Sequence, residues 1–211
     1  MSHSFFIFNH FIDIYYYNEP STMLCFAKAL IMSINLVIDF EISEGLAALY
    51  AESSTDEFIG NKEGELTVAE AFAKLQVYAA TKTYGAFERI GFMKIYKDDV
   101  LVGFSMPREI KEREHKVFKL PEGVQWHRIG TVYIGKQYRK QGIMRNVIKT
   151  FLTMYPNLVW TCNEKNRASM YSAAAGGLHH SHTIYVGEDK YWEHQPFEGM
   201  IRTDLVFKSV L

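Results

Sequence analysis

The stretch from Thr131 to Phe151 carries the residues best suited to chemistry, because an apolar run leads into a basic turn and then into a helical pattern. The turn contains Arg139, Lys140 and Gly142. The first amides of a helix lack intrahelical partners, and the helix dipole leaves that end partly positive. A glycine lets an anion approach such amides closely, and an arginine can hold two phosphate oxygens. On these residues alone, a phosphate site and a solvated surface turn fit equally well.

Two common phosphate-binding motifs are excluded at this turn. A Walker loop requires Gly-Lys-Ser/Thr, which is missing here. The dinucleotide fingerprint requires three glycines, and the turn holds one. If the turn binds phosphate, it does so by another arrangement of backbone amides and cations.

Metal and disulfide chemistry is not predicted. His180 and His182 share one face of an expected strand, but His179 points the other way and no carboxylate stands at a matching spacing. The two cysteines, Cys25 and Cys162, are far apart and lack ligand spacing. This pattern favours a reducing, cytoplasmic setting without a metal centre.

The turn is positioned by a strand expected from about Trp126 to Ile134 and by a helix expected from about Gly142 to Tyr155, before Pro156. A hairpin is expected further upstream, with its polar turn at 97–99. Strands and helices alternate through the chain, which predicts one α/β domain with a mixed sheet.

Helix starts are readable earlier in the chain. Ser43 is a plausible cap of a first helix, and Thr67 with Glu70 forms a capping-box pattern before a second. After the turn, a fourth helix with a double-glycine stop is expected in the segment 166–177.

Composition limits the class of protein. The 211 residues are 48% hydrophobic, enough for one sizeable domain, and 23 basic residues nearly balance 24 acidic ones. This balance gives no broad steering toward nucleic acid. Residues 1–31 read as an extension or an extra element, and Met23 or Met32 is an alternative start. The segment 21–38 is interrupted by Lys28, so a membrane span is not expected.

The order of elements around the turn resembles the GNAT superfamily of acyl-coenzyme A (acyl-CoA)-dependent N-acyltransferases. The family motif Arg/Gln-x-x-Gly-x-Gly/Ala is matched at its Arg and first Gly by 139–144. A second signature, Asn-x-x-Ser followed by Gly-hydrophobic, is matched by 166–169 and 177–178. The resemblance covers about 86–187, and more loosely 34–85.

The resemblance implies a mixed, mostly antiparallel α/β (α+β) sheet with a V-shaped split between two central strands and helices on both faces, as a single domain over 32–211. In such a split the pantetheine arm lies along the fourth strand and the turn holds the pyrophosphate. The residues implied to bind acetyl-CoA are Ile134, Arg139, Lys140, Gln141, Gly142, Ile143, Met144 and Asn166.

The catalytic candidates are weaker. Many members carry a tyrosine that protonates the leaving thiolate, but alignment places Ala173 there, and Tyr171 lies about 200° around the helix from that position. Ser169 and Tyr171 are candidate acids, and His127 is a candidate base. Each has a structural alternative: helix polarity, helix packing and a rim histidine. Met144 departs from the family's small residue.

The sequence therefore predicts an enzyme that transfers an acetyl or related acyl group from acyl-CoA to an amine, by direct attack in a ternary complex. The acceptor, a small molecule or a protein, is not encoded in any recognisable segment, and a homodimer is left open. Alternative functions are a non-catalytic GNAT-like domain and a nucleic-acid- or nucleotide-modifying member of the fold.

Overall fold

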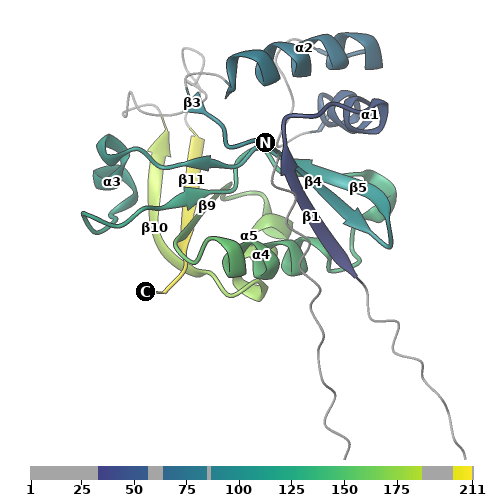
Figure 1. Cartoon of the computed structure of the whole chain (residues 1–211). Coiled ribbons are helices and arrows are strands. Elements are labelled where there is room, and N and C mark those ends of the chain that lie inside the picture. Colours follow the sequence, from purple (N-terminus) through teal and green to yellow (C-terminus); the bar gives the residue numbers. More distant parts are fainter. Residues whose placement is uncertain (1–32, 57–63, 85–86, 187–201, 211) are drawn as a thin grey trace, which may run out of the picture.

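The computed structural model describes residues 33–56, 64–84, 87–186 and 202–210 (Figure 1). The predicted extension, 1–31, and the alternative starts at Met23 and Met32 lie outside these residues.

One half of the structure is an antiparallel sheet with the strand order β1-β4-β5-β8. The hairpin predicted from the sequence forms its middle, and the turn residues Asp98 and Asp99 both adopt left-handed backbone conformations. The strands of this sheet are β1 (Ile34–Asp39), β4 (Phe92–Lys97), β5 (Val100–Ser105) and β8 (Tyr133–Ile134).

The other half is a sheet with the order β10-β11-β9-β7-β6, in which only the pairing of β7 with β9 is parallel. A two-stranded ribbon, β2 (Thr83–Tyr84) with β3 (Phe87–Glu88), accompanies the sheets. The strands of the second half are β6 (Arg108–Glu109), β7 (His127–Arg128), β9 (Leu158–Asn163), β10 (His179–Val186) and β11 (Arg202–Lys208).

Side-chain caps fix the starts of three helices. Ser43 accepts from the amide of Leu46, the capping box of Thr67 and Glu70 is complete, and Asn166 accepts from the amide of Ser169. The helices are α1 (Glu44–Ser53), α2 (Val68–Thr81), α3 (Glu112–Phe118), α4 (Ile143–Met154) and α5 (Arg167–Ala175).

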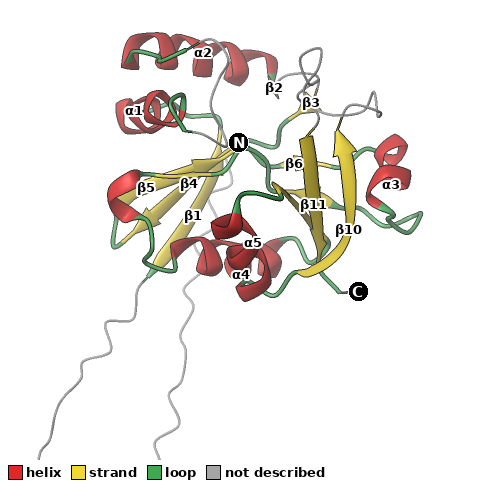
Figure 2. Ribbon diagram, turned by 180° about the vertical axis from the view of Figure 1, so that it is seen from behind, coloured by secondary structure: helices red, strands yellow, loops and turns green. Residues whose placement is uncertain are grey.

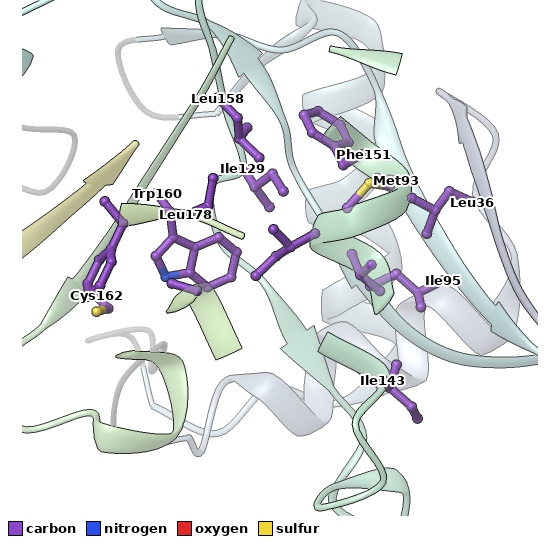
Figure 3. Packing of buried hydrophobic residues seen from close by; sticks show 14 of the residues in the cluster. Leu36, Met93, Ile95, Ile129, Ile143, Phe151, Leu158, Trp160, Cys162 and Leu178 are labelled. Carbon is purple, nitrogen blue, oxygen red and sulfur yellow. The ribbon is translucent and has the colours of Figure 1, made fainter. Parts of the chain in front are cut away.

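The helices cover both faces of the sheets (Figures 1 and 2). On one side, α1 and α2 pack their buried residues against Phe104 and Tyr133. On the other, α4 packs against both halves, and Val147 and Phe151 join one apolar cluster with Met93 and Trp160 (Figure 3). This arrangement confirms the predicted α/β class with a mixed sheet.

The second half has a core of its own on the side away from α4. Phe118 of α3 and Trp126 pack there against Val159 and Val206. Because neighbouring residues of a strand face opposite ways, Val159 lies on the α3 face while Trp160 lies on the α4 face. None of the helices in the described part of the chain combines the length and the apolarity of a membrane span.

Candidate functional site

The strand predicted from Trp126 to Ile134 is not continuous. Its first part, β7, pairs with β9 and its last part, β8, pairs with β5. Between them the chain changes direction, and Thr131 adopts a left-handed conformation with φ 46°. The prediction of a single strand was therefore wrong in detail, because one peptide segment changes its partner midway.

This change of partner opens the sheet. The parallel pairing ends at Arg128 and Val159. Beyond that point, no described strand pairs with the edge of β9 that faces β7. No described strand pairs with the edge of β8 that faces away from β5. The two halves thus diverge from a vertex at Arg128 and Val159. We call the space between β8 and the far part of β9 the split.

The backbone of Ile134 faces the split. Antiparallel ladders alternate between hydrogen-bonded and non-hydrogen-bonded pairs. Gly135 donates to the carbonyl of Val102, so the preceding pair, Ile134 with Gly103, is non-hydrogen-bonded. The N–H and C=O of Ile134 therefore point away from β5.

The basic turn presents unsatisfied amides at the start of α4. Lys140 (φ 62°) and Gly142 (φ 72°) both adopt left-handed conformations, and Gly142 caps the helix without a side-chain bond. Among the described residues, none accepts a hydrogen bond from the amides of 140–145. These amides stay available to an anion, and the dipole of a 12-residue helix adds to them.

Arg139 connects the basic turn to the end of β8, beside the split. Its Nε donates to the carbonyl of Ile134 at 3.0 Å, and its Nη2 lies 2.8 Å from Oδ2 of Asp56. The guanidinium also lies 5.0 Å from the centre of the Tyr133 ring. At 40% exposure it still reaches solvent, so Arg139 both fixes the strand end and adds charge beside the turn.

The basic turn also contacts a cation from another element, which the sequence did not single out for the site. Lys97 donates through Nζ to Oε1 of Gln141 at 2.6 Å. Lys97 ends β4, and only the pairing of β1, β4 and β5 brings it here. Met144 is partly buried, and its side chain packs against the apolar cluster that contains Val147 and Phe151 of α4.

An acidic residue supports the same strand end from α1. Glu52 accepts a hydrogen bond from the amide of Lys136 at 3.1 Å. Burial, with Glu52 nearby, raises the pKa of Tyr133 to about 12. Tyr133 is therefore a neutral, packed residue at ordinary pH.

The start of α5 brings Asn166 and Ser169 close to β9. The Ser169 hydroxyl accepts a hydrogen bond from Nε1 of Trp160 at 3.0 Å. With that acceptor position filled, the Ser169 hydroxyl retains a proton to donate. This hydrogen bond was not evident from the Asn-x-x-Ser spacing alone.

The structure does not bring the other catalytic candidates to the split. Tyr171 is 74% exposed on the outer side of α5, while Ala173 is fully buried. The ring of His127 packs against Tyr155 at 4.2 Å, beyond the end of α4 that lies opposite the turn. Burial lowers the pKa of His127.

Strand β10, which carries His179, His180 and His182, and the two surface hollows also lie away from the split. Nε2 of His182 lies 2.9 Å from the carbonyl of Val117. No group of three metal-binding side chains occurs in the part of the chain that is described. A hollow of about 370 Å³ is lined by Glu109, His127 and Tyr155 at the paired ends of β7 and β9, and another lies beside Lys111.

Comparisons with known proteins give structural likeness without sequence matches. No protein-family model matches the chain, and no curated protein matches it. The Microcin C7 self-immunity acetyltransferase MccE, solved with acetyl-CoA and AMP, has a TM-score of 0.59 at 13% identity over 84% of this chain and 92% of its own.

Two further solved structures of acetyltransferases are similar to this chain in fold. A GNAT-family acetyltransferase from Bacillus anthracis has a TM-score of 0.55 at 15% identity, over 85% of this chain and 97% of its own. A ribosomal-protein-alanine N-acetyltransferase from Brucella melitensis has a TM-score of 0.53 at 15% identity, over 85% and 99%. The chain shares the fold of these proteins.

Proposed function

We propose that this chain, which has the GNAT fold, is an acetyl-CoA-dependent N-acetyltransferase. The observation that carries the proposal is the joint between the split and the turn. Among the described residues, no strand pairs with the edge that ends at Ile134, and none accepts a hydrogen bond from the amides of 140–145 in the turn that follows Arg139. Together these features are complementary to acetyl-CoA: the strand edge to its extended thioester arm, and the turn amides to the diphosphate at the end of that arm.

The residues present fit such a ligand. The N–H groups of Gln141, Gly142 and Met144 would hold the pyrophosphate, with Arg139 and Lys140 adding charge. The N–H of Ile134, directed into the split, would donate to the thioester carbonyl and stabilise the negative charge that develops on it. Acetyl-CoA supplies the activated acyl group for transfer to the amine.

Ser169 is our candidate for protonating the leaving sulfur, and the proton that the attacking amine loses would replace the one that its hydroxyl gives up. Its oxygen is held by the indole N–H of Trp160, so its own proton is directed elsewhere. Asn166 fixes the same helical turn by accepting from the Ser169 amide. Tyr171 and His127 remain predictions, and their positions away from the split make Ser169 the stronger choice.

The direct test is calorimetric titration with acetyl-CoA, comparing wild type with Gly142→Asp and Gly142→Asn. Both side chains have nearly the same size, and both residues tolerate a left-handed backbone better than most. Asp adds a carboxylate that occupies the turn amides and repels phosphate. We expect affinity at least about tenfold lower for Gly142→Asp than for Gly142→Asn.

Gly123 provides a control elsewhere in the chain. It also has a left-handed conformation, with open space around it, so Gly123→Asp adds the same charge away from the turn. Its affinity for acetyl-CoA should equal that of wild type. If wild type does not bind acetyl-CoA, or if the two Gly142 variants bind equally, the proposal fails.

A second function, binding without catalysis, is favoured by one observation. Ala173 is buried at the position where many GNAT enzymes carry a tyrosine that acts as a general acid, and Tyr171 faces solvent. Release of CoA thiol in the presence of a panel of amines separates the two functions. A protein that binds acetyl-CoA but never accelerates thiol release over the background rate is a binding domain.

A further inference from the structure

A hollow of about 370 Å³ lies where β7 and β9 begin, one residue pair before the vertex of the split. Its lining comes from β6, from β7 and from the chain that follows α4, so only the folded sheet brings these segments together. A volume of this size is at the lower end for small-molecule sites. The proposed reaction makes no use of this hollow.

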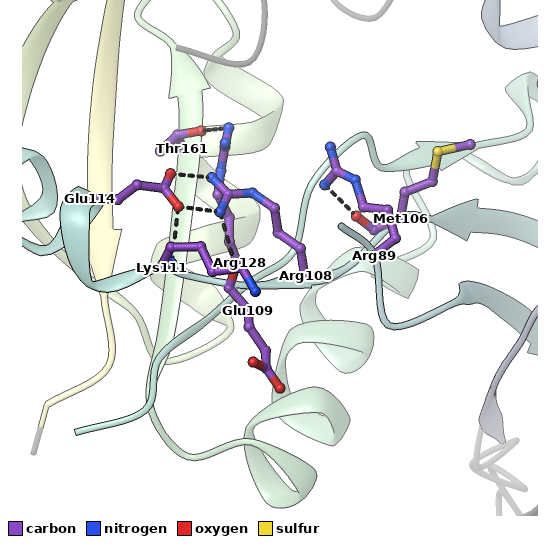
Figure 4. Close-up of polar contacts among 8 residues, drawn as sticks. All are labelled: Arg89, Met106, Arg108, Glu109, Lys111, Glu114, Arg128 and Thr161. Atoms are coloured by element: carbon purple, nitrogen blue, oxygen red, sulfur yellow. Dashed lines mark hydrogen bonds and ion pairs between the residues drawn. The ribbon is translucent and has the colours of Figure 1, made fainter. Parts of the chain in front are cut away.

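Glu109 and His127 face the hollow from neighbouring strands. They are directly opposed in the pairing of β6 with β7, so their side chains leave the same face of the sheet. The preceding residue, Arg108, bonds to Glu114 on the α3 face, and Glu109 therefore points to the α4 face. Figure 4 shows the Glu109 side chain extending away from Arg108 and Glu114.

The carboxylate of Glu109 has no ion-pair partner in the described part of the chain. No hydrogen bond or ion pair reaches its oxygens. The nearest cation along the chain on its C-terminal side, Lys111, is paired with Glu88 at 2.8 Å. Among the described residues that line the hollow there is no Lys or Arg. The hollow therefore contains a negative charge that no ion pair neutralises.

Two aromatic rings form a fixed wall beside this carboxylate. The ring of Tyr155 lies 4.2 Å from that of His127 and 4.7 Å from that of Phe151. Although His127 is only 9% exposed, its ring nitrogens have no hydrogen-bond partner among the described residues, and neither has the hydroxyl of Tyr155. Buried polar groups are normally hydrogen-bonded, so these atoms are available to a ligand.

The remaining polar groups of the hollow also favour a cation. Nδ2 of Asn157 donates to the carbonyl of Gln125 at 3.1 Å, which leaves the side-chain oxygen of Asn157 as an acceptor. The hollow lies at the C-terminal end of α4, where the helix dipole is negative, and the last turn of α4 carries no basic residue. Burial lowers the pKa of His127 and raises that of Tyr155, so both rings are neutral at ordinary pH.

We propose that this hollow binds a small organic cation, an alkylammonium or an alkylguanidinium, at a second site separate from the split. The carboxylate of Glu109 would form a charge-assisted hydrogen bond with the cation, and the rings of His127 and Tyr155 would contribute acceptors and π faces. An anion would be repelled by Glu109, and the described residues offer no three-ligand metal site. The inference does not depend on the proposed function.

Three probes of one chain length test this site. The isotope-labelled protein is titrated with n-butylammonium chloride, n-butylguanidinium chloride and the neutral n-butanol, at constant chloride concentration, and the amide signals are followed by NMR. We expect at least one cation to bind with a dissociation constant of about 1 mM or below, and n-butanol to bind at least about tenfold more weakly. The signals that shift should be those of Glu109, His127, Tyr155 and Asn157, and the tighter cation identifies the head group.

Variants assign the binding to the hollow. Glu109→Gln should weaken cation binding at least about tenfold, and the fold should persist because no protein group bonds to this carboxylate. Tyr155→Phe keeps the ring, removes the hydroxyl and should weaken binding by about threefold. Glu122→Gln removes the same charge from an exposed residue that does not line the hollow, and should leave the affinity unchanged.

Several results would overturn the proposal. One is n-butanol binding as tightly as the cations, and another is equal loss of affinity in Glu109→Gln and Glu122→Gln. Signal shifts confined to Ile134 and to 140–145 would place the probe in the split and not in the hollow. An absence of saturable binding by both cations also overturns it. None of these outcomes bears on whether the chain binds acetyl-CoA.

Discussion

At the scale of single residues, Ser169 is the most informative side chain. Its oxygen receives the indole proton of Trp160, so removal of the hydroxyl deletes a proton donor near β9 and leaves the Trp160 N–H without its partner. We expect Ser169→Ala to lower kcat by about 100-fold, as for loss of a general acid, with acetyl-CoA affinity nearly unchanged. Steady-state kinetics with calorimetry measure both quantities.

Ser172 supplies a matched control for this substitution. It lies on the same helix, and its hydroxyl donates to the carbonyl of Ala168. Ser172→Ala should leave kcat within about twofold of wild type, since a surface substitution of this kind has small effects. Equal losses in the two variants would mean that Ser169 acts on helix stability and not on the reaction.

Residue identities alone singled out part of the candidate site. Arg139 and Gly142 were proposed because a basic turn between a strand and a helix has a physical reason to bind phosphate. The pairing of Arg139 with Asp56 was not foreseeable, because 83 residues separate them.

At the scale of elements, Gly103 controls how closely β8 approaches β5. A Cβ atom there would lie 2.4 Å from the carbonyl oxygen of Tyr133 and 2.6 Å from Cδ1 of Ile134. We expect Gly103→Ala to cost about 1–3 kcal/mol of unfolding free energy, because overpacking forces the backbone apart. Acetyl-CoA affinity should fall as well, since the Ile134 amide moves with β8.

Gly45 provides the comparison for this substitution. It lies in the first turn of α1, where an added Cβ would meet Cδ2 of Leu101 at 3.3 Å and Oγ of Ser43 at 3.9 Å. Leu101 can move, and alanine favours the helix, so Gly45→Ala should be neutral or stabilising. Urea unfolding of both variants measures the difference, and equal stability would contradict the close packing of β8.

Helices and strands were predicted more reliably where a short sequence pattern, such as a helix cap or a hairpin turn, specifies them. The caps of α1 and α2 and the hairpin of β4 and β5 follow from short patterns, and all were confirmed. The strand expected at 126–134 was wrong in continuity, because hydrophobic alternation does not report which neighbour a strand pairs with. A change of partner is a property of the whole sheet.

At the scale of the whole molecule, acid should destabilise the fold through two histidines, the buried His127 and the half-buried His182. Burial lowers the pKa of both His127 and His182 from the ordinary value of 6.5. The unfolded chain then takes up protons first, so stability is complete above that value and falls as pH drops through it toward the lower native pKa values. We expect the Tm to fall between about pH 7 and about pH 5.

His127→Gln should reduce this loss, since it removes one of the two titrating groups and leaves His182. His179, which is exposed on β10, gives the matched substitution. In His179→Gln the fall of Tm with acid should resemble that of wild type. Thermal unfolding followed across this pH range decides the matter, and identical curves for the two variants would exclude His127 as a contributor.

The split also has a consequence for the protein when it carries no ligand. Backbone groups along an open strand recognise amide spacing and ignore side chains, so any extended polypeptide is chemically suited to the same slot. On the proposed function, bound acetyl-CoA covers this open strand edge in addition to supplying the acetyl group. The cellular supply of acetyl-CoA would then set what share of these molecules is exposed to strand invasion and aggregation.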